Sequence, residues 1–194
     1  MKQCKCFSLI LLLLISLSPA GAIAGEKELI QQMRSGAAVL MIRHALAPGI
    51  GDPEDFKLDN CSTQRNLNEQ GRDQARAIGE WLRTRGIHNV TLYSSQWCRC
   101  LETARLMNLG IVTPFPALNS FFEIPENREQ SLSELRKFIR GNTKPGELII
   151  MVTHQVTISG ITGKWTDSGR GKLVRPGQAG GIELLGELDF NDKD

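Results

Sequence analysis

The sequence is poor in the side chains from which metal sites are built, with three histidines and five cysteines among 194 residues. The C-x-C pair of Cys98 and Cys100 has no second cysteine pair or nearby histidine that would complete four zinc ligands. A metal site on His44 and His154 is also disfavoured, because no carboxylates or cysteine pairs cluster near them in the sequence. We therefore expect no metal, and no other cofactor.

An excess of charge of one sign is absent as well. The chain has 23 basic and 21 acidic residues, and removing residues 1–24, which include Lys2 and Lys5, leaves the remainder formally neutral. Domains that bind nucleic acid or anionic lipid through bulk charge are strongly basic. We therefore expect no nucleic acid as a partner.

Only one long hydrophobic run is present, and it lies at the amino terminus. Residues 7–17 are mostly apolar, follow Lys2 and Lys5, and precede Pro19 and small residues that end at Ala24. The run is short for a membrane span, which needs about 20 residues, and the whole pattern is typical of a secretory signal peptide. We predict a signal peptide over residues 1–24, a periplasmic or secreted protein, and no stable membrane insertion after cleavage.

Residues 25–194 have the length of one domain, and no repeat or linker divides them. Three cysteines remain in this domain, and an oxidising compartment favours a disulfide. Cys61 can pair with Cys98 or with Cys100, and the sequence does not choose between them. A bridge between Cys98 and Cys100 is disfavoured because so small a ring strains the bond geometry.

Apolar runs that are typical of buried strands alternate with segments of helical periodicity. Strands are predicted at residues 37–43, 90–94 and 148–153, with a last strand, at an edge, within 180–190. Helices are predicted at 67–86, 97–107, 135–141 and 155–163, the third of them with Ser131 and Glu134 as a capping box. This order predicts an α/β fold, a three-layer α/β/α sandwich with a mostly parallel central sheet.

Two of the three histidines directly follow predicted strands. His44 ends "VLMIRH" and His154 ends "IIMVTH", and the carboxyl ends of parallel strands meet at one edge, where ligands bind. Arg43 precedes His44, and Arg99 lies in the first turn of a helix that follows a strand, so it comes from the same edge. Two guanidiniums and two imidazoles that converge there form a pocket suited to a phosphoryl group.

The same residues predict phosphoryl transfer. Guanidiniums near His44 disfavour a further positive charge, and a neutral imidazole is a nucleophile. We expect in-line transfer of the phosphoryl group to His44 and then to water, which is phosphomonoester hydrolysis through a phosphohistidine.

The leaving alkoxide needs a proton, and the best candidate donor is Glu123. Its position between Phe122 and Ile124 predicts desolvation, which would raise its pKa. Glu126 and Glu129 are alternative donors.

Three other polar residues have plainer interpretations. Arg65 precedes a helix start, where it either reaches the phosphate or only caps and solvates the helix. Arg72 has the position of a solvated helix-face residue, and His88 that of a surface connector between a helix and a strand.

The segments "IRHA", "LNEQGRDQA", "YSSQWCRCLETA" and "VTHQVTISGITG" resemble, in order and spacing, the four landmarks of branch 1 of the histidine phosphatase superfamily. The resemblance spans about residues 39–163 and implies a phosphoglycerate-mutase-like fold without a metal. It also implies that His44 is the phosphorylated nucleophile and that a carboxylate after the second strand, best matched by Glu123, is the proton donor. The other residues that it places in the phosphate pocket are Arg43, Arg99 and His154.

Two departures from the family pattern shape the expected function. Ala45 stands where the family usually has glycine, and residues 46–65 replace the stretch typical of sugar-phosphate mutases. The loop over residues 45–66 should lie over the phosphate pocket and select the substrate.

We expect an exported phosphomonoesterase acting on a small-molecule or envelope-linked phosphate ester. Some exported relatives resemble enzymes that remove phosphate from the heptose of lipopolysaccharide core, so an envelope sugar phosphate is the leading specific expectation. The alternatives are a protein phosphohistidine phosphatase and a non-catalytic phosphate-binding module.

Overall fold

The structure is a computed structural model that describes residues 25–190. The predicted signal peptide, residues 1–24, lies outside the described residues. Within residues 25–190, no helix has both the length and the apolar character needed to cross a membrane.

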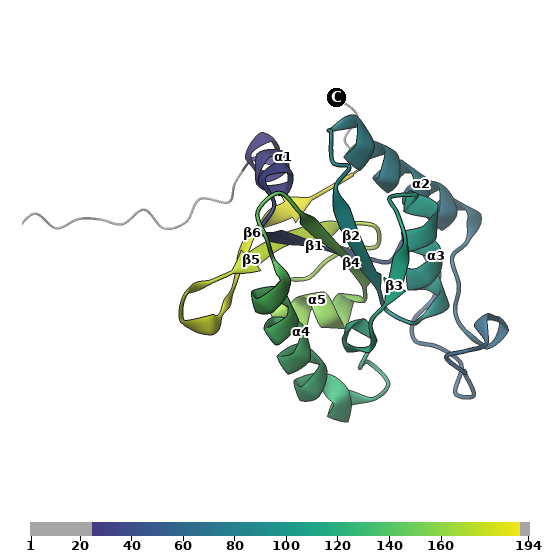
Figure 1. The fold of residues 1–194 in the computed structure, drawn as a ribbon. Helices are drawn as coiled ribbons and strands as arrows, with labels where there is room; N and C mark the ends of the chain where they lie inside the picture. Colours follow the sequence, from purple (N-terminus) through teal and green to yellow (C-terminus); the bar gives the residue numbers. More distant parts are fainter. Residues whose placement is uncertain (1–24, 191–194) are drawn as a thin grey trace, which may run out of the picture.

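A six-stranded mixed sheet with the strand order β3-β2-β4-β1-β5-β6 forms the centre of the molecule (Figure 1). The four strands from β3 to β1 are parallel, and β5 runs antiparallel to both of its neighbours, β1 and β6. The predicted mostly parallel sheet is therefore confirmed. The strands are β1 (Ala38–Arg43), β2 (Val90–Ser94), β3 (Val112–Pro114), β4 (Leu148–Thr153), β5 (Gly171–Pro176) and β6 (Ile182–Leu188).

Helices cover both faces of this sheet, as the alternating pattern of the sequence predicts. In β1, Leu40 and Ile42 pack in one apolar cluster with α1, α2 and α3, whereas Val39 and Met41 pack in a second cluster with α4 and α5. Successive side chains of a strand point to opposite faces, so two helical layers enclose the sheet. The helices are α1 (Glu26–Ser35), α2 (Glu69–Thr84), α3 (Cys98–Met107), α4 (Arg128–Asn142) and α5 (Gln155–Thr162), and the short 3₁₀ turns are η1 (Cys61–Thr63), η2 (Pro116–Leu118), η3 (Pro125–Asn127) and η4 (Gln178–Gly180).

Helix α2 approaches its neighbours through two glycines. A Cβ atom at Gly79 would lie 1.9 Å from the carbonyl oxygen of Met107 in α3, and one at Gly71 would lie 2.0 Å from the carbonyl oxygen of Leu46. Real Cβ atoms do not approach backbone so closely, so only glycine permits this packing. The contact at Gly71 fixes the start of the loop that follows β1.

The predicted capping box at Ser131 and Glu134 is wrong. Helix α4 begins at Arg128, directly after the turn η3, so Ser131 lies inside its first turn. The residue before the helix, Asn127, makes no side-chain capping hydrogen bond. The turn at Pro125 sets the helix start here, rather than a capping side chain.

Three elements were not predicted, namely α1, β3 and β5. Strand β3 has only three residues, which is too short for a periodic signal. Strand β5 carries Lys172 and Arg175 among its residues, and Lys172 is buried because it pairs with Glu187 of β6 at 2.5 Å. Because these charged residues interrupt the apolar run, the hydrophobicity pattern does not predict a buried strand at this position.

Candidate active site

His44 and His154 lie side by side because their strands are parallel neighbours in register. Arg43, the last residue of β1, pairs with Thr153, the last residue of β4. The His44 amide then donates a hydrogen bond to the Thr153 carbonyl at 2.9 Å. The two imidazole centroids are 5.5 Å apart, and both side chains are buried.

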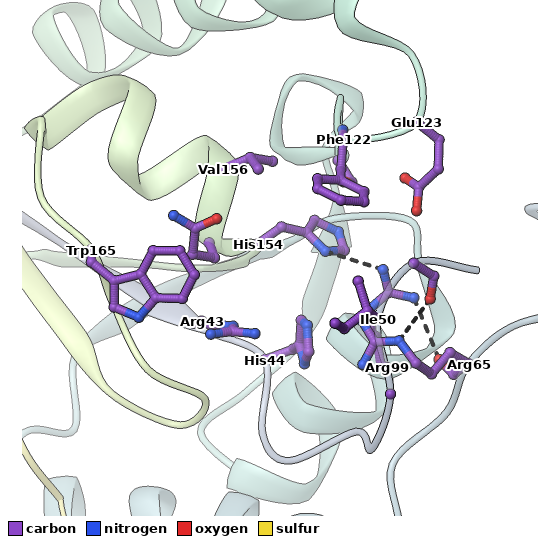
Figure 2. A pocket seen from close by; sticks show the side chains of 14 residues that line it. Arg43, His44, Ile50, Arg65, Arg99, Phe122, Glu123, His154, Val156 and Trp165 are labelled. Carbon is purple, nitrogen blue, oxygen red and sulfur yellow. Dashed lines mark hydrogen bonds between the residues drawn. The ribbon is translucent and has the colours of Figure 1, made fainter.

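Both histidines line a pocket of about 330 Å³ at the carboxyl edge of the parallel strands (Figure 2). All six residues singled out from the sequence line this pocket: Arg43, His44, Arg65, Arg99, Glu123 and His154. Glu126 and Glu129, the alternative donors, are exposed and do not line it. His88 and Arg72 do not line it either.

The ring of His44 is held in one tautomer by the backbone. Its Nδ1 lies 2.8 Å from the carbonyl oxygen of Ala45, which can only accept a hydrogen bond. Nδ1 therefore carries the proton, and Nε2 keeps the lone pair that a nucleophile needs. The Ala45 amide in turn donates to the hydroxyl of Thr103 in α3 at 3.0 Å, which fixes the backbone beside the ring.

Ala45 fits its position without strain, although the family pattern has glycine there. Its φ is not positive, so the backbone does not require glycine. Its methyl group is fully buried in a small apolar cluster with Ala47, Leu67 and Ala75.

His154 is held by partners on both ring nitrogens. Arg99 can only donate, and its Nη2 lies 3.5 Å from Nδ1 of His154. Nδ1 is therefore the acceptor, and Nε2 donates to the hydroxyl of Ser95 at 2.9 Å. The Ser95 hydroxyl donates to Asn119 at 3.1 Å, so the ring is part of a connected polar network.

Both imidazoles are held in the neutral form. Burial is the largest cause that lowers the pKa of His44 well below its ordinary value of 6.5, and the Arg99 charge lowers it further. Burial and then Arg99 lower the pKa of His154 in the same way. This direction agrees with the neutral state predicted for His44, but desolvation contributes more to it than the neighbouring guanidiniums.

Arg99 is anchored by Asp52, a residue that the sequence did not single out. Arg99 Nη1 donates to both carboxylate oxygens of Asp52, at 2.9 and 3.0 Å, and the Asp52 side chain is fully buried. The same carboxylate accepts from the indole N–H of Trp97 at 3.0 Å and from the backbone N–H of Arg65 at 2.9 Å. The loop after β1 therefore supplies the buried counter-charge of the pocket.

The other two guanidiniums are oriented by backbone carbonyl groups. Arg43 Nη1 donates to the Thr166 carbonyl at 3.1 Å, and Arg65 donates to the carbonyls of Ala47 and Gly51. Among residues 25–190, the buried Nε groups of Arg43 and Arg99 have no hydrogen-bond acceptor. Arg65 thus stabilises the loop after β1 by hydrogen bonds within it, while the Nε groups of Arg43 and Arg99 remain available to donate to an oxyanion.

The predicted desolvation of Glu123 is wrong. Its side chain lines the rim of the pocket, but both Glu123 and Phe122 are exposed. Phe121 is buried, but the chain then turns outward at Phe122 and Glu123, so the apolar neighbours in the sequence do not enclose the carboxyl group. Glu123 does lie at the pocket mouth (Figure 2), but it is not desolvated by its neighbours in the sequence.

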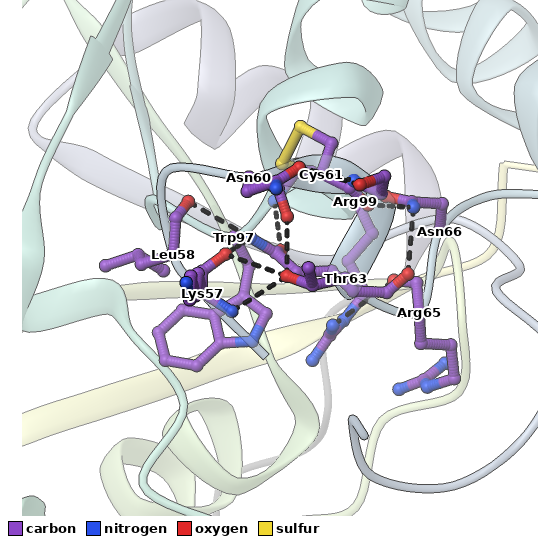
Figure 3. The surroundings of a disulfide bond; sticks show 12 residues. Lys57, Leu58, Asn60, Cys61, Thr63, Arg65, Asn66, Trp97 and Arg99 are labelled. Carbon is purple, nitrogen blue, oxygen red and sulfur yellow. Dashed lines mark hydrogen bonds between the residues drawn. A yellow bond between two sulfur atoms is a disulfide. The ribbon is translucent and has the colours of Figure 1, made fainter. Parts of the chain in front are cut away.

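A disulfide joins the loop after β1 to the start of α3 (Figure 3). Cys61 pairs with Cys98, which decides between the two pairings that the sequence left open. Cys100 is the buried free thiol, and burial raises its pKa to about 12. The amide of Cys98 also donates to the Gln64 side chain at 2.9 Å, so this loop is tied to the helix that carries Arg99.

No obvious sequence signal marks the further residues of the site. Asp52 lies in an aperiodic loop, Ser95 is one of two serines after β2, and Trp165 follows α5 without a motif. Only the unusual length of the loop pointed to the region of Asp52. Within the described part of the chain, no three His, Cys, Asp or Glu side chains group as metal ligands.

The comparisons with known proteins agree with this fold. Residues 39–132 match the family described as the histidine phosphatase superfamily (branch 1), a range that includes His44, Arg99 and Glu123. No curated protein matches the sequence.

Solved structures with the same fold are only distantly similar in sequence. The protein histidine phosphatase SixA complexed with tungstate has a TM-score of 0.55 at 12% identity, covering 79% of this chain and 97% of that chain. Phosphoserine phosphatase from Entamoeba histolytica, in complex with 3-phosphoglyceric acid, has a TM-score of 0.57 at 14% identity, with 78% and 96% covered. A mycobacterial hydrolase has a TM-score of 0.55 at 15% identity, with 76% and 96% covered. At these identities the likeness shows the fold alone.

The buried neutral histidines predict how stability depends on pH. Below about pH 6.5 the unfolded chain binds protons that the folded imidazoles do not, so the free energy of unfolding falls as the pH falls and levels off above that pH. In urea titrations, His44→Asn should make this fall less steep by about 1.4 kcal/mol per pH unit. The control His88→Asn changes an exposed histidine, and equal slopes for His44→Asn and wild type would contradict the assignment.

The anchoring of Arg99 predicts the effect of Asp52→Asn. The new side-chain NH2 group would face the N–H groups that now donate to the carboxylate, and Arg99 would lose its counter-charge. The free energy of unfolding, measured in urea, should therefore fall by about 3 kcal/mol. The affinity for inorganic phosphate, measured by calorimetry, should fall at least about tenfold because Arg99 loses its orientation. Asp55→Asn removes an exposed carboxylate from the same loop as the control. Equal phosphate affinity in Asp52→Asn and Asp55→Asn would show that Asp52 does not position Arg99.

Proposed function

Residues 39–132 of this chain belong to branch 1 of the histidine phosphatase superfamily, and on that premise we propose that the protein is an exported phosphomonoesterase that forms a phosphohistidine on His44. The observation that carries this proposal is the site of His44. Its neutral ring, with Nε2 unprotonated, shares one pocket with three guanidiniums. An imidazole nucleophile beside cations that spread the charge of the transition state is suited to in-line phosphoryl transfer without a metal.

The proposed reaction has two steps. In the first, Nε2 of His44 bonds to phosphorus, the ester P–O bond breaks, and Glu123 gives its proton to the leaving alkoxide. In the second, Glu123 takes a proton from water, the water oxygen bonds to phosphorus, and the Nε2–P bond breaks to release phosphate. Arg43, Arg99 and His154 surround the phosphoryl oxygens in both steps.

Export and an envelope sugar phosphate are the finer parts of the proposal. The disulfide between Cys61 and Cys98 supports an oxidising compartment, in agreement with the signal-peptide pattern of residues 1–24. A pocket of about 330 Å³ admits a small phosphate ester such as a sugar phosphate. The leading specific substrate is therefore a sugar phosphate of the cell envelope.

A protein phosphohistidine phosphatase is the second candidate. The likeness to SixA, a protein histidine phosphatase, favours it, and the same cationic floor would hold a phosphoryl group carried on nitrogen. The two functions differ in the leaving group, because an imidazole is a better leaving group than an alkoxide. Comparing turnover of a phosphohistidine peptide with that of a hexose phosphate separates them.

Hydrolysis of a nitrophenyl phosphate by residues 25–194 tests the main proposal. Wild type should turn over with a chelator present and no metal added, and His44→Ala should lose the activity because the substitution removes the nucleophile. His88→Ala, which changes an exposed histidine outside the pocket, is the matched control. Phosphate binding by the wild-type protein without turnover of any ester would instead establish the non-catalytic binding module.

The role of Glu123 predicts a dependence on the leaving group. Glu123→Gln should lower kcat/KM for ethyl phosphate about 100-fold, because an alkoxide must be protonated as it leaves. For nitrophenyl phosphate the loss should stay below about tenfold, because nitrophenolate leaves without a proton. Glu126→Gln is the control, since Glu126 lies outside the pocket. A selective loss in Glu126→Gln, and not in Glu123→Gln, would move the acid to that residue.

A further inference from the structure

The mouth of the pocket carries an unusual share of the exposed apolar surface. In residues 25–190, the large apolar side chains with high exposure are Ile50 at 90%, Ile111 at 90%, Trp165 at 64% and Phe122 at 56%. All of these except Ile111 line the pocket that holds the two histidines. Exposed apolar side chains scattered singly need no explanation, but a group of them at one site marks a contact surface.

The three side chains come from separate parts of the chain. Ile50 belongs to the loop after β1, Phe122 to the segment between η2 and η3, and Trp165 to the segment after α5. Figure 2 shows them around the two histidines, with Trp165 and Phe122 on different sides of the pocket. We call Ile50, Phe122 and Trp165 the apolar rim. The fold gathers this rim, since no continuous apolar run in the sequence contains it.

Contacts of the backbone or of the side chain place each rim residue at the pocket mouth. Ile50 lies between Gly49 and Gly51, whose φ angles of 98° and 66° are favoured only by glycine, and Arg65 Nε donates to the Gly51 carbonyl at 2.8 Å. These contacts fix the tip of the loop so that the isoleucine side chain stands at the pocket mouth.

The indole of Trp165 is oriented in a similar way. Its N–H donates to Asp167 at 3.0 Å, and the Arg43 guanidinium lies 5.9 Å from the ring centroid. The amide of Phe122 donates to the buried Ser120 hydroxyl at 3.2 Å. The backbone is therefore tied down beside Ile50 and at Phe122, and the indole of Trp165 is oriented by its own hydrogen bond.

The floor and the rim of the pocket differ in chemistry. The floor presents the guanidiniums of Arg43 and Arg99, whose buried Nε groups have no acceptor among residues 25–190 and complement a phosphoryl group. The rim presents apolar surface at the place where the alcohol half of a bound ester would lie. An ester whose phosphate binds the guanidiniums of the floor would direct its alcohol half toward the rim at the pocket mouth.

We propose that the substrate is a phosphate ester whose alcohol half carries a ring with an apolar face, and that this face packs against Ile50, Phe122 and Trp165. The proposal rests on the phosphomonoesterase function proposed above and names its substrate class. A hydrocarbon ring and the C–H face of a sugar ring are two examples of such a face.

Three esters of primary alcohols test this proposal, because their leaving groups are similar in basicity. Ethyl phosphate has no ring, cyclohexylmethyl phosphate has a hydrocarbon ring, and a hexose 6-phosphate has a sugar ring. At least one ring ester should exceed ethyl phosphate about tenfold or more in kcat/KM, the effect of covering a few tens of Å² of apolar surface. The ring that is preferred identifies the source, and equal values for all three esters overturn the proposal.

Variants of the apolar rim test whether these side chains cause the preference for a ring ester over ethyl phosphate. Trp165→Ala and Ile50→Ala should each reduce the ratio of kcat/KM between the preferred ring ester and ethyl phosphate at least about threefold. Ile111→Ala is the matched control for Ile50→Ala, because both isoleucines are 90% exposed and Ile111 lies outside the pocket. An unchanged ratio in both rim variants overturns the proposal. If the rim variants lose binding to phosphatidylglycerol vesicles while their ratio of kcat/KM is unchanged, the rim serves a membrane surface, and the proposal is likewise overturned.

Failure of the proposal can be told apart from failure of the phosphatase function. If no ester is hydrolysed, the phosphatase function fails, and calorimetry still compares the affinities for cyclohexylmethyl and ethyl phosphate. Tighter binding of the ring ester that depends on Trp165 supports the rim as the recognition surface. Equal affinities overturn it.

Discussion

The parallel, in-register pairing of β1 with β4 is the constraint on which the site depends. It places the residues after Arg43 and Thr153 at one level of the sheet edge, and the hydrogen bond from the His44 amide to the Thr153 carbonyl extends the pairing by one step. Both imidazoles are consequently buried beside each other. Burial then sets their neutral state, because a charged imidazole would lose its hydration there.

The loop after β1 completes what the sheet edge begins. Guanidiniums gathered around neutral rings need a counter-charge, and the loop brings the buried carboxylate of Asp52 against Arg99. The disulfide between Cys61 and Cys98 links this loop to the helix that carries Arg99. Arg65 donates hydrogen bonds to loop carbonyls on both sides of Ile50. The loop thus links the charge balance of the floor to the apolar rim.

Much of this arrangement could be predicted from the sequence where local pattern and topology act together. The apolar runs before His44 and His154 predicted strands, and the shared edge of parallel strands predicted their meeting. Asp52 could not be predicted, because its partner Arg99 is distant in sequence and the loop that carries Asp52 has no periodicity. The exposure of Glu123 was missed for a related reason: apolar neighbours along the chain do not enclose a carboxyl group when one of them, Phe122, is itself exposed.

The central claim is that His44 itself carries the phosphoryl group, and its most direct test is to trap that intermediate. Wild-type protein would be quenched in alkali during turnover, digested and analysed by mass spectrometry, because phosphohistidine survives alkali and is lost in acid. The account predicts an acid-labile phosphoryl group on the peptide that contains His44, and on no other histidine. A phosphoryl group on a different residue, or turnover in which no phosphorylated peptide accumulates even under rapid quench, would contradict it.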